Sequence, residues 1–162
     1  MSDHMEIPIQ VSLPLDEGYL RRECPVCMRQ FKWWSGHHPS RPADAEDPAE
    51  YHCPYCNATA GPGSWYTQPQ IETIQSVKAH TVQDLVQKEL GATIRELNRS
   101  GFIQAELRSE HVPDSVPLDE PPDMHKVVPP CHSYEPLKVE DNWADPVHCI
   151  VCGEPFDPTL SG

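Results

Sequence analysis

The segment "RECPVCMRQFKWW", residues 22–34, joins a Cys-x-x-Cys pair to a run that is rich in strand-forming side chains. A second pair, "CPYC", follows at residues 53–56. Each pair forms a tight turn that points two sulfur atoms inward, so two such pairs supply the ligands of a tetrahedral metal site. The predicted ligands of this first site are Cys24, Cys27, Cys53 and Cys56.

Zinc is the metal that this ligand set favours, because thiolates from two paired turns are a usual structural zinc environment. A rubredoxin-like iron site uses the same thiolates, and the spacing does not separate the two metals. A thioredoxin-like redox role is disfavoured, since neither pair starts a helix beside a βαβ pattern. A complete set of thiolates also closes the coordination shell, so we expect this site to be structural.

The runs beside the pairs, "RQFKWW" and "AEYHC", predict the short strands of a zinc ribbon. Asn57 follows the second pair and tolerates a left-handed backbone. Met28 follows the first pair, where glycine is frequent, so we expect the first turn to be less regular. Residues 35–50 form a polar excursion between the pairs, and its His37 and His38 are interpreted as surface residues rather than as further ligands.

Aromatic residues near the first site have two interpretations, as an exposed recognition surface or as core. The chain has only three phenylalanines, so a small module would use these rings as core and as cover for the metal. The residues concerned are Trp33, Trp34, Trp65 and Tyr66.

A second group of cysteines lies in "CHSYEPLKVEDNWADPVHCIVC", residues 131–152. "PLKV" and "PVHCIVCG" predict two short strands joined by the turn "EDNWADP", with Gly153 in the permissive position after the pair. The N-terminal part of this group offers a single cysteine, Cys131. Tyr134 occupies the position three residues later, where a second cysteine would complete a Cys-x-x-Cys pair. The predicted sulfur ligands of the second site are Cys131, Cys149 and Cys152.

The spacing leaves several choices for the fourth ligand of the second site. His132 is the first choice, because a Cys and a His that adjoin in a turn can reach one ion. His125 is the second choice, and His148 is weaker because adjoining strand residues point to opposite faces. Water is the remaining choice, with Glu135 or Glu140 as a base, although acidic residues in this tail are more often simply solvated.

The best helical signal in the chain lies between the two groups and begins near "TQPQIETIQSVKAH". Its apolar residues recur every three or four positions and give one apolar face. Thr67 and Gln70 have the spacing of a capping box, and Gly101 can close the helix. Gly91 weakens the helix locally and is a candidate break between two shorter helices. The apolar residues are Ile71, Ile74, Val77, Val82, Leu85, Val86, Leu90, Ile94 and Leu97.

The sequence divides into parts with different predicted structures. Residues 1–66 and 124–162 are the two ribbons, and residues 67–112 hold the helix followed by "FIQAELRSEHV", a strand or a short helix. Residues 113–123 contain four prolines and four acidic residues, which predicts an extended linker. The predicted fold class is α+β, with two zinc-ribbon β lobes flanking a central amphipathic helix and one zinc ion in each lobe.

The formal net charge of −13 is unevenly spread, and residues 113–162 carry 10 acidic against 2 basic residues. Such a balance disfavours binding to a phosphate backbone. No apolar run approaches the roughly 20 residues that span a bilayer, and the N-terminus has no basic start before an apolar block, so no secretion signal is predicted. We expect a cytoplasmic protein without membrane contact, where Cys-x-x-Cys pairs are better explained by metal or redox chemistry than by disulfides.

Three stretches together resemble a group of uncharacterised bacterial zinc-ribbon proteins: "LPLDEGYLRRECPVCMRQFKWW", "YHCPYC" with "GSWYTQPQ", and "DMHKVVPPCHSYEPLKVEDNWADPVHCIVCG". In this group the Cys-His dipeptide and the Cys-x-x-Cys-Gly look like one signature. The resemblance therefore implies a second site made of Cys131, His132, Cys149 and Cys152. It implies no activity.

A non-catalytic zinc-binding protein, with structural ribbons that serve as a protein-interaction module, explains these features best. The apolar face of the helix would bind a protein partner or support a homodimer. One alternative is a nucleic-acid-binding ribbon that uses Arg21, Arg22, Arg29 and Lys32, although the net charge disfavours it. The other alternative is a metalloenzyme or redox protein with an open second site, for which the sequence shows neither a base nor a pocket.

Overall fold

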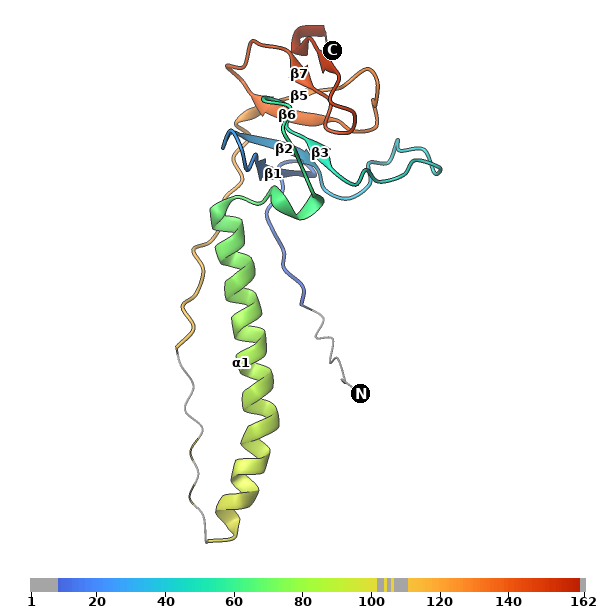
Figure 1. Cartoon of the computed structure of the whole chain (residues 1–162). Coiled ribbons are helices and arrows are strands. Elements are labelled where there is room, and N and C mark those ends of the chain that lie inside the picture. Colours follow the sequence, from blue (N-terminus) through green and yellow to red (C-terminus); the bar gives the residue numbers. More distant parts are fainter. Residues whose placement is uncertain (1–8, 102–103, 105, 107–110, 161–162) are drawn as a thin grey trace. The chain divides into compact units, whose positions relative to one another are not determined.

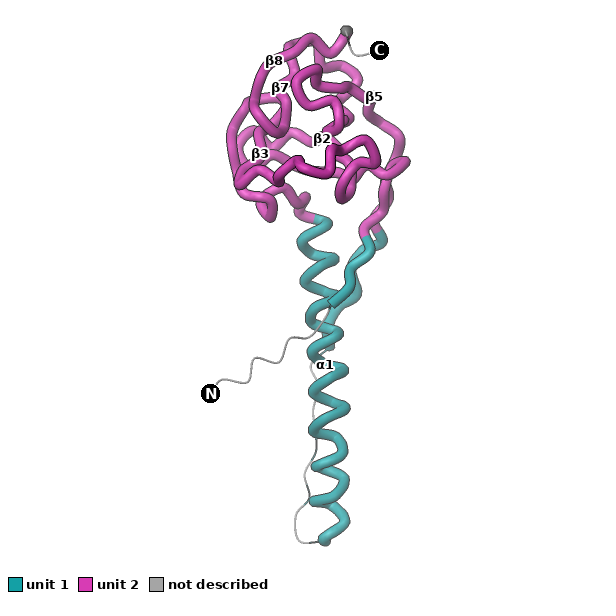
Figure 2. The backbone as a smooth tube through the Cα atoms, turned by 90° about the vertical axis from the view of Figure 1, so that its right-hand side faces the viewer, with its two compact units in different colours: residues 1–12, 69–117 teal, residues 13–68, 118–162 magenta. Residues whose placement is uncertain are grey.

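The structure, a computed structural model, describes residues 9–101, 104, 106 and 111–160. The chain forms two compact units, which are shown in different colours in Figure 2. The helical unit comprises residues 1–12 and 69–117, and the sheet unit comprises residues 13–68 and 118–162. Both cysteine groups therefore belong to the sheet unit.

The long helix α1, Gln68–Arg99, begins directly after Thr67, as the capping spacing predicts (Figure 1). It runs without interruption through Gly91, so the predicted break is wrong. One helical glycine costs only about 1 kcal/mol relative to alanine, and the residues around it are good helix formers. The left-handed Gly101, with φ 73°, follows the helix at its C-terminal end.

The chain after the helix returns along its first half within the helical unit. The Ser76 hydroxyl donates to the carbonyl of Pro113 at 3.1 Å, and His80 Nε2 lies 3.2 Å from Asp114 Oδ1. The segment "FIQAELRSEHV", predicted as a strand or a short helix, lies mostly outside the described residues. Residues 111–123 have no regular secondary structure, as expected for a proline-rich stretch.

The predicted apolar face of α1 remains largely uncovered from Val82 onward. Val82, Val86, Leu90 and Leu97 are all exposed. Within the described residues, no helix combines the length and the apolar character needed to cross a membrane.

Four antiparallel strands make the main sheet of the sheet unit, in the order β1-β2-β6-β5 (Figure 1). Two small hairpins complete the strands of this unit, β3 with β4 and β7 with β8. Short 3-10 turns cover Pro62–Ser64 and Pro158–Leu160. The predicted α+β class is thus confirmed. The strand bounds are β1 Tyr19–Glu23, β2 Gln30–Trp34, β3 Tyr51–His52, β4 Thr59–Ala60, β5 Met124–Val127, β6 Leu137–Glu140, β7 Val147–His148 and β8 Pro155–Phe156.

The main sheet joins the two ribbon regions, a point that the sequence leaves open. Strand β2 from the N-terminal region pairs with β6 from the C-terminal region, and Trp33 lies opposite Leu137. The predicted strands at "PLKV" and "PVHC" exist as β6 and β7, but they pair with other strands and not with each other. Pairing with β2 lets β6 bury Leu137 and Val139 in the common core.

One face of the main sheet carries the core. Phe31 lies at its centre, with the rings of Trp33 and Trp65 each 5.8 Å away in edge-to-face contact. Trp65 is fully buried and Trp33 is nearly so. The core interpretation of these two tryptophans is therefore confirmed. Trp143 packs on the ring of Tyr55 at 4.7 Å and is partly buried against the same core.

The opposite face of the sheet carries a row of basic residues, one from each strand. Cross-strand register places Arg21 beside Lys32, Lys32 beside Lys138, and Lys138 beside Lys126. Like charges on directly opposite strand residues destabilise a sheet unless counter-charges cover them. The necessary carboxylates come from chain segments outside the strands.

Three carboxylates neutralise most of this basic row. Asp16 Oδ2 lies 2.9 Å from Lys32 Nζ and 2.8 Å from Lys138 Nζ. Glu120 and Asp123, at the end of the predicted linker, contact both Arg21 and Lys32 at 2.7 to 3.2 Å. The last residues of the acidic segment are thus fixed to the sheet by charge.

Candidate metal centres

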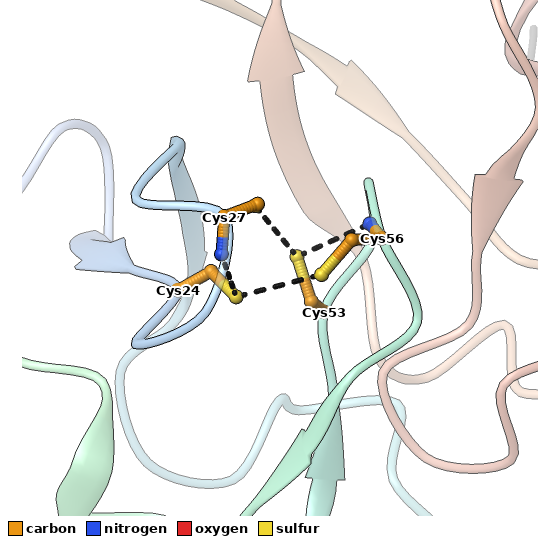
Figure 3. Close-up of side chains that lie close together, drawn as sticks. All are labelled: Cys24, Cys27, Cys53 and Cys56. Carbon is orange, nitrogen blue, oxygen red and sulfur yellow. Dashed lines mark hydrogen bonds between the residues drawn. The ribbon is translucent and has the colours of Figure 1, made fainter.

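The first cysteine cluster is built from two turns of the sheet unit. Cys24 and Cys27 lie in the turn between β1 and β2, whereas Cys53 and Cys56 lie in the turn between β3 and β4. Figure 3 shows the sulfur atoms converging from these two turns. The four sulfur atoms all lie within 4.8 Å of one another, so the cluster could hold a metal ion.

The sulfur spacing of this cluster fits a tetrahedral ion. A Zn–S bond of about 2.3 Å in tetrahedral geometry separates the sulfurs by about 3.8 Å. Across the two turns, Cys24 and Cys56 are 3.6 Å apart and Cys27 and Cys53 are 3.7 Å apart. A disulfide would bring two sulfurs to about 2.05 Å, and all seven cysteines are free.

The second cluster joins the loop after β5 to the turn between β7 and β8, and it contains the predicted His132. Its four ligand atoms also lie within 4.8 Å of one another, so this cluster too could hold a metal ion. Cys131 and Cys152 have sulfurs 3.3 Å apart, and His132 Nδ1 lies 3.5 Å from Cys149 Sγ. A zinc ion with one imidazole and thiolates predicts a nitrogen–sulfur separation of about 3.6 Å.

The other ligand choices for the second site have different partners. His125, on β5, has its Nδ1 3.2 Å from Asp141. His148 Nδ1 lies 3.1 Å from the carbonyl oxygen of Gly153. Among the residues that the structure describes, His132 is the histidine that joins the three sulfurs. The ligand set implied by the sequence signature is therefore brought together in space.

The two acids considered as catalytic bases are also engaged elsewhere. Glu135 lies 3.5 Å from Arg41, and Glu140 lies 3.1 Å from Arg29. His37 contacts Asp47 at 3.3 Å, and the His38 ring packs on Trp34 at 4.8 Å. Both histidines lie in the loop after β2, as the sequence predicts, and neither belongs to a four-atom cluster of the described residues.

All three Cys-x-x-Cys turns have the same backbone hydrogen bonds. In each turn the N–H four residues after the first cysteine donates to the carbonyl of that cysteine, at 2.8 to 3.0 Å. The first cysteine in turn donates its N–H to the carbonyl five residues ahead. The residue after each pair is left-handed, with φ of 62° at Met28, 62° at Asn57 and 77° at Gly153. The expectation that the first turn is less regular is therefore wrong.

Backbone N–H groups in these turns also point at sulfur. The N–H groups of Val26 and Cys27 lie 3.3 and 3.4 Å from Cys24 Sγ. Burial alone would raise the pKa of Cys24, but these N–H groups hold it below its usual value. At Cys149 burial prevails and raises the pKa of the thiol to about 12. A bound cation would be needed to ionise such a thiol at neutral pH.

Replacing Met28 with glycine is expected to stabilise the metal-loaded protein by roughly 1 kcal/mol, because glycine adopts a left-handed backbone without steric cost. Met28 is 62% exposed, so little packing is lost. Urea unfolding of the zinc-loaded protein measures the change. Met28→Ala is the matched control, since it removes most of the same side chain but keeps the Cβ atom and therefore the steric cost of the left-handed backbone. Equal stability of the two variants would contradict the explanation.

The turns of the two clusters are joined by a reciprocal pair of backbone hydrogen bonds. His52, just before Cys53, donates its N–H to Ile150 at 2.8 Å, and His148, just before Cys149, donates to Pro54 at 2.9 Å. Gly153 lies beside this junction, where a Cβ atom would come within 2.7 Å of His52. Spacing arguments treat each ribbon alone, so the sequence gives no sign of this junction. The two candidate sites are consequently linked directly by backbone hydrogen bonds between their turns.

No protein-family model, no curated protein and no solved structure matches the chain. The likeness to bacterial zinc-ribbon proteins therefore rests on the sequence motifs alone. The two candidate metal sites rest on the side-chain geometry.

Proposed function

We propose that the chain is a non-catalytic zinc-binding protein, in which two structural zinc ions hold the sheet unit together as a protein-interaction module. The observation that carries this proposal is the pair of four-atom clusters, each with its ligand atoms within 4.8 Å of one another, in one folded unit. The proposed zinc ligands are Cys24, Cys27, Cys53 and Cys56 in the first site, and Cys131, His132, Cys149 and Cys152 in the second.

The second ligand set favours zinc over iron. A rubredoxin-like iron site uses thiolates only, whereas zinc binds both all-cysteine sets and sets of three cysteines with one histidine. One metal therefore suits both clusters. In each site the protein supplies a complete tetrahedron, so the chain itself leaves no position for a reacting water. This closed shell supports a structural role over a catalytic one.

The charges of the sheet unit support a protein partner over a nucleic acid. Arg21 and Lys32 are held by Glu120 and Asp123, and Arg29 is paired with Glu140 at 3.1 Å. Phosphate binding depends on basic groups that are free to neutralise the backbone. Here Arg21, Arg29 and Lys32 are already paired with acids inside the fold, and Arg22 is buried.

The exposed apolar residues on α1 supply a surface that a protein would bind. An amphipathic helix offers side chains at spacings of three and four to a partner groove or to a second helix. Val82, Val86 and Leu90 are such residues, each more than two-fifths exposed. A second copy of the chain is one partner of this kind.

His132→Ala is expected to lower the zinc content from two ions per chain to about one, because a three-thiolate site competes poorly with a chelator. Zinc is counted by elemental analysis after equilibration with a moderate chelator. His125→Ala is the matched control, since His125 neighbours Asp141 and not the cluster. Two ions retained in His132→Ala would remove His132 from the ligand set, and a loss in His125→Ala would point to that residue instead.

A further inference from the structure

A pocket of about 280 Å³ lies in the sheet unit, and both ribbon regions contribute to it. Arg22 of β1 and Trp33 of β2 border it from the main sheet. The loop of residues 35–50 closes one side with Arg41, and the C-terminal region adds Glu135. A loop of this length without secondary structure is uncommon and is often functional. The pocket exists only when both ribbon regions are assembled.

Arg22 has an unusual environment for a charged side chain. Arg22 is only 8% exposed. Its guanidinium carbon lies 4.4 Å from the centre of the Trp33 ring and 4.7 Å from the centre of the Tyr66 ring. Tyr66 also offers its hydroxyl to the guanidinium. The Nε and Nη1 atoms nevertheless have no hydrogen-bond partner. A buried donor without a partner is costly, more so when it is charged, and such a group calls for an explanation.

The other charged residues at the pocket are one arginine, Arg41, and two acids, Asp47 and Glu135. Arg41 lies 2.9 Å from Asp47 and 3.5 Å from Glu135, so its charge is neutralised within the protein. Within the described residues, no carboxylate forms an ion pair with Arg22. The formal charges at the pocket therefore sum to zero, but both acids lie against Arg41 and neither pairs with Arg22. A carboxylate on a ligand would give Arg22 the partner that these acids do not supply.

The volume of the pocket and its lining residues restrict the ligand further. The volume is at the small end of the roughly 300–1,000 Å³ usual for small-molecule sites. Trp33 and Tyr51 border the pocket with rings whose centres are 4.9 Å apart. Flat aromatic groups pack well on such rings. A phosphate dianion fits less well, because its second charge would add to the negative charges of Asp47 and Glu135, which already share Arg41.

We propose that this pocket binds a small aromatic carboxylate, with the carboxylate on the guanidinium of Arg22 and the ring against Trp33 and Tyr51. Arg22 lines the pocket and its unpaired N–H groups are buried, so binding requires a rotation of the side chain that brings these groups toward the ligand. The bound carboxylate then supplies the missing partner as a charge-assisted hydrogen bond.

Benzoate binding to the zinc-loaded full chain tests the proposal by isothermal titration calorimetry. We expect saturable binding that is weakened at least about tenfold in Arg22→Gln. Arg29→Gln is the matched control, because Arg29 also lies over a tryptophan ring, at 5.0 Å from Trp143, but is paired with Glu140 at 3.1 Å. The control should bind benzoate as the unaltered chain does.

Benzamide and inorganic phosphate test the same site on the unaltered chain, so the result does not depend on the folding of a variant. Benzamide has the shape of benzoate without its charge, and we expect it to bind at least about tenfold more weakly. Inorganic phosphate should also bind more weakly than benzoate. Absence of benzoate binding, equal binding of benzamide, or tighter binding of phosphate would each overturn the proposal.

Discussion

Removal of both metal ions by a strong chelator is expected to unfold the sheet unit. Three of the proposed ligands, Cys24, Cys53 and Cys149, are fully buried, so the clusters are part of the core. Structural zinc contributes an apparent free energy of roughly 10–16 kcal/mol in small domains, which is as large as the roughly 5–15 kcal/mol that stabilises an ordinary domain. The aromatic core alone would not replace this contribution.

Near-ultraviolet circular dichroism follows this unfolding, because Trp33 and Trp65 are held rigidly in the core. The signal should vanish on chelation and return when zinc is added. The reciprocal hydrogen bonds from His52 and His148 join the two sites, so we expect one transition rather than two. A core signal that survives complete metal removal would show that apolar packing alone keeps the sheet unit folded. Two separate transitions would show that the regions around the two sites unfold independently.

Asp16→Ala is expected to destabilise the metal-loaded protein by about 3–5 kcal/mol, the usual cost of removing one partner from a buried ion pair. Asp16 is 7% exposed, and one of its oxygens contacts both Lys32 and Lys138. Without it, the carboxylate that the described part of the chain still places near Lys138 is that of Glu17, at 3.8 Å. Urea unfolding at neutral pH measures the loss.

Asp141→Ala is the control for the loss of an exposed ion pair. Asp141 is 71% exposed and lies 3.2 Å from His125, so its removal should cost less than about 1 kcal/mol. Equal losses in the two aspartate variants would show that the buried basic row does not depend on Asp16.

The cost of Asp16→Ala should also depend on pH. Hydrogen bonds from Lys138 and Lys32 hold the pKa of Asp16 below its usual value in the folded protein. Its contribution is therefore complete above the unfolded pKa of about 3.9 and is lost as the pH falls through the lower folded value. The stability difference between variant and unaltered chain should shrink in that window. Because release of the metal at acid pH would itself unfold the sheet unit, the two proteins are compared down to the lowest pH at which both retain zinc.

The first cluster could be predicted from sequence because its geometry is local. A Cys-x-x-Cys turn fixes two sulfurs within four residues, and two such turns complete a tetrahedron. The adjacency of Cys131 and His132 likewise indicated the second cluster. The regular turn at Met28 could not be predicted, because a methionine with a left-handed backbone is rare. The backbone hydrogen bonds of the turn hold Met28 in this conformation.

Long-range pairing could not be predicted in the same way. The basic residues Arg21 and Lys32 leave a phosphate-binding surface as an alternative that the net charge disfavours, and their partners Glu120 and Asp123 come from the segment that follows the helical unit. The pairing of β2 with β6 depends on which strands bury their apolar faces together, and no local signal marks that choice. The pocket at Arg22 could not be predicted either, because residues from both ribbon regions line it.

Counting the metal ions on the unaltered chain tests the central claim most directly. Native mass spectrometry of protein purified without added metal gives the mass of the intact complex. The two-cluster structure predicts the chain mass plus two zinc ions as the main species. A main species that carries one metal ion or none, or that carries iron, would contradict the assignment of two structural zinc sites.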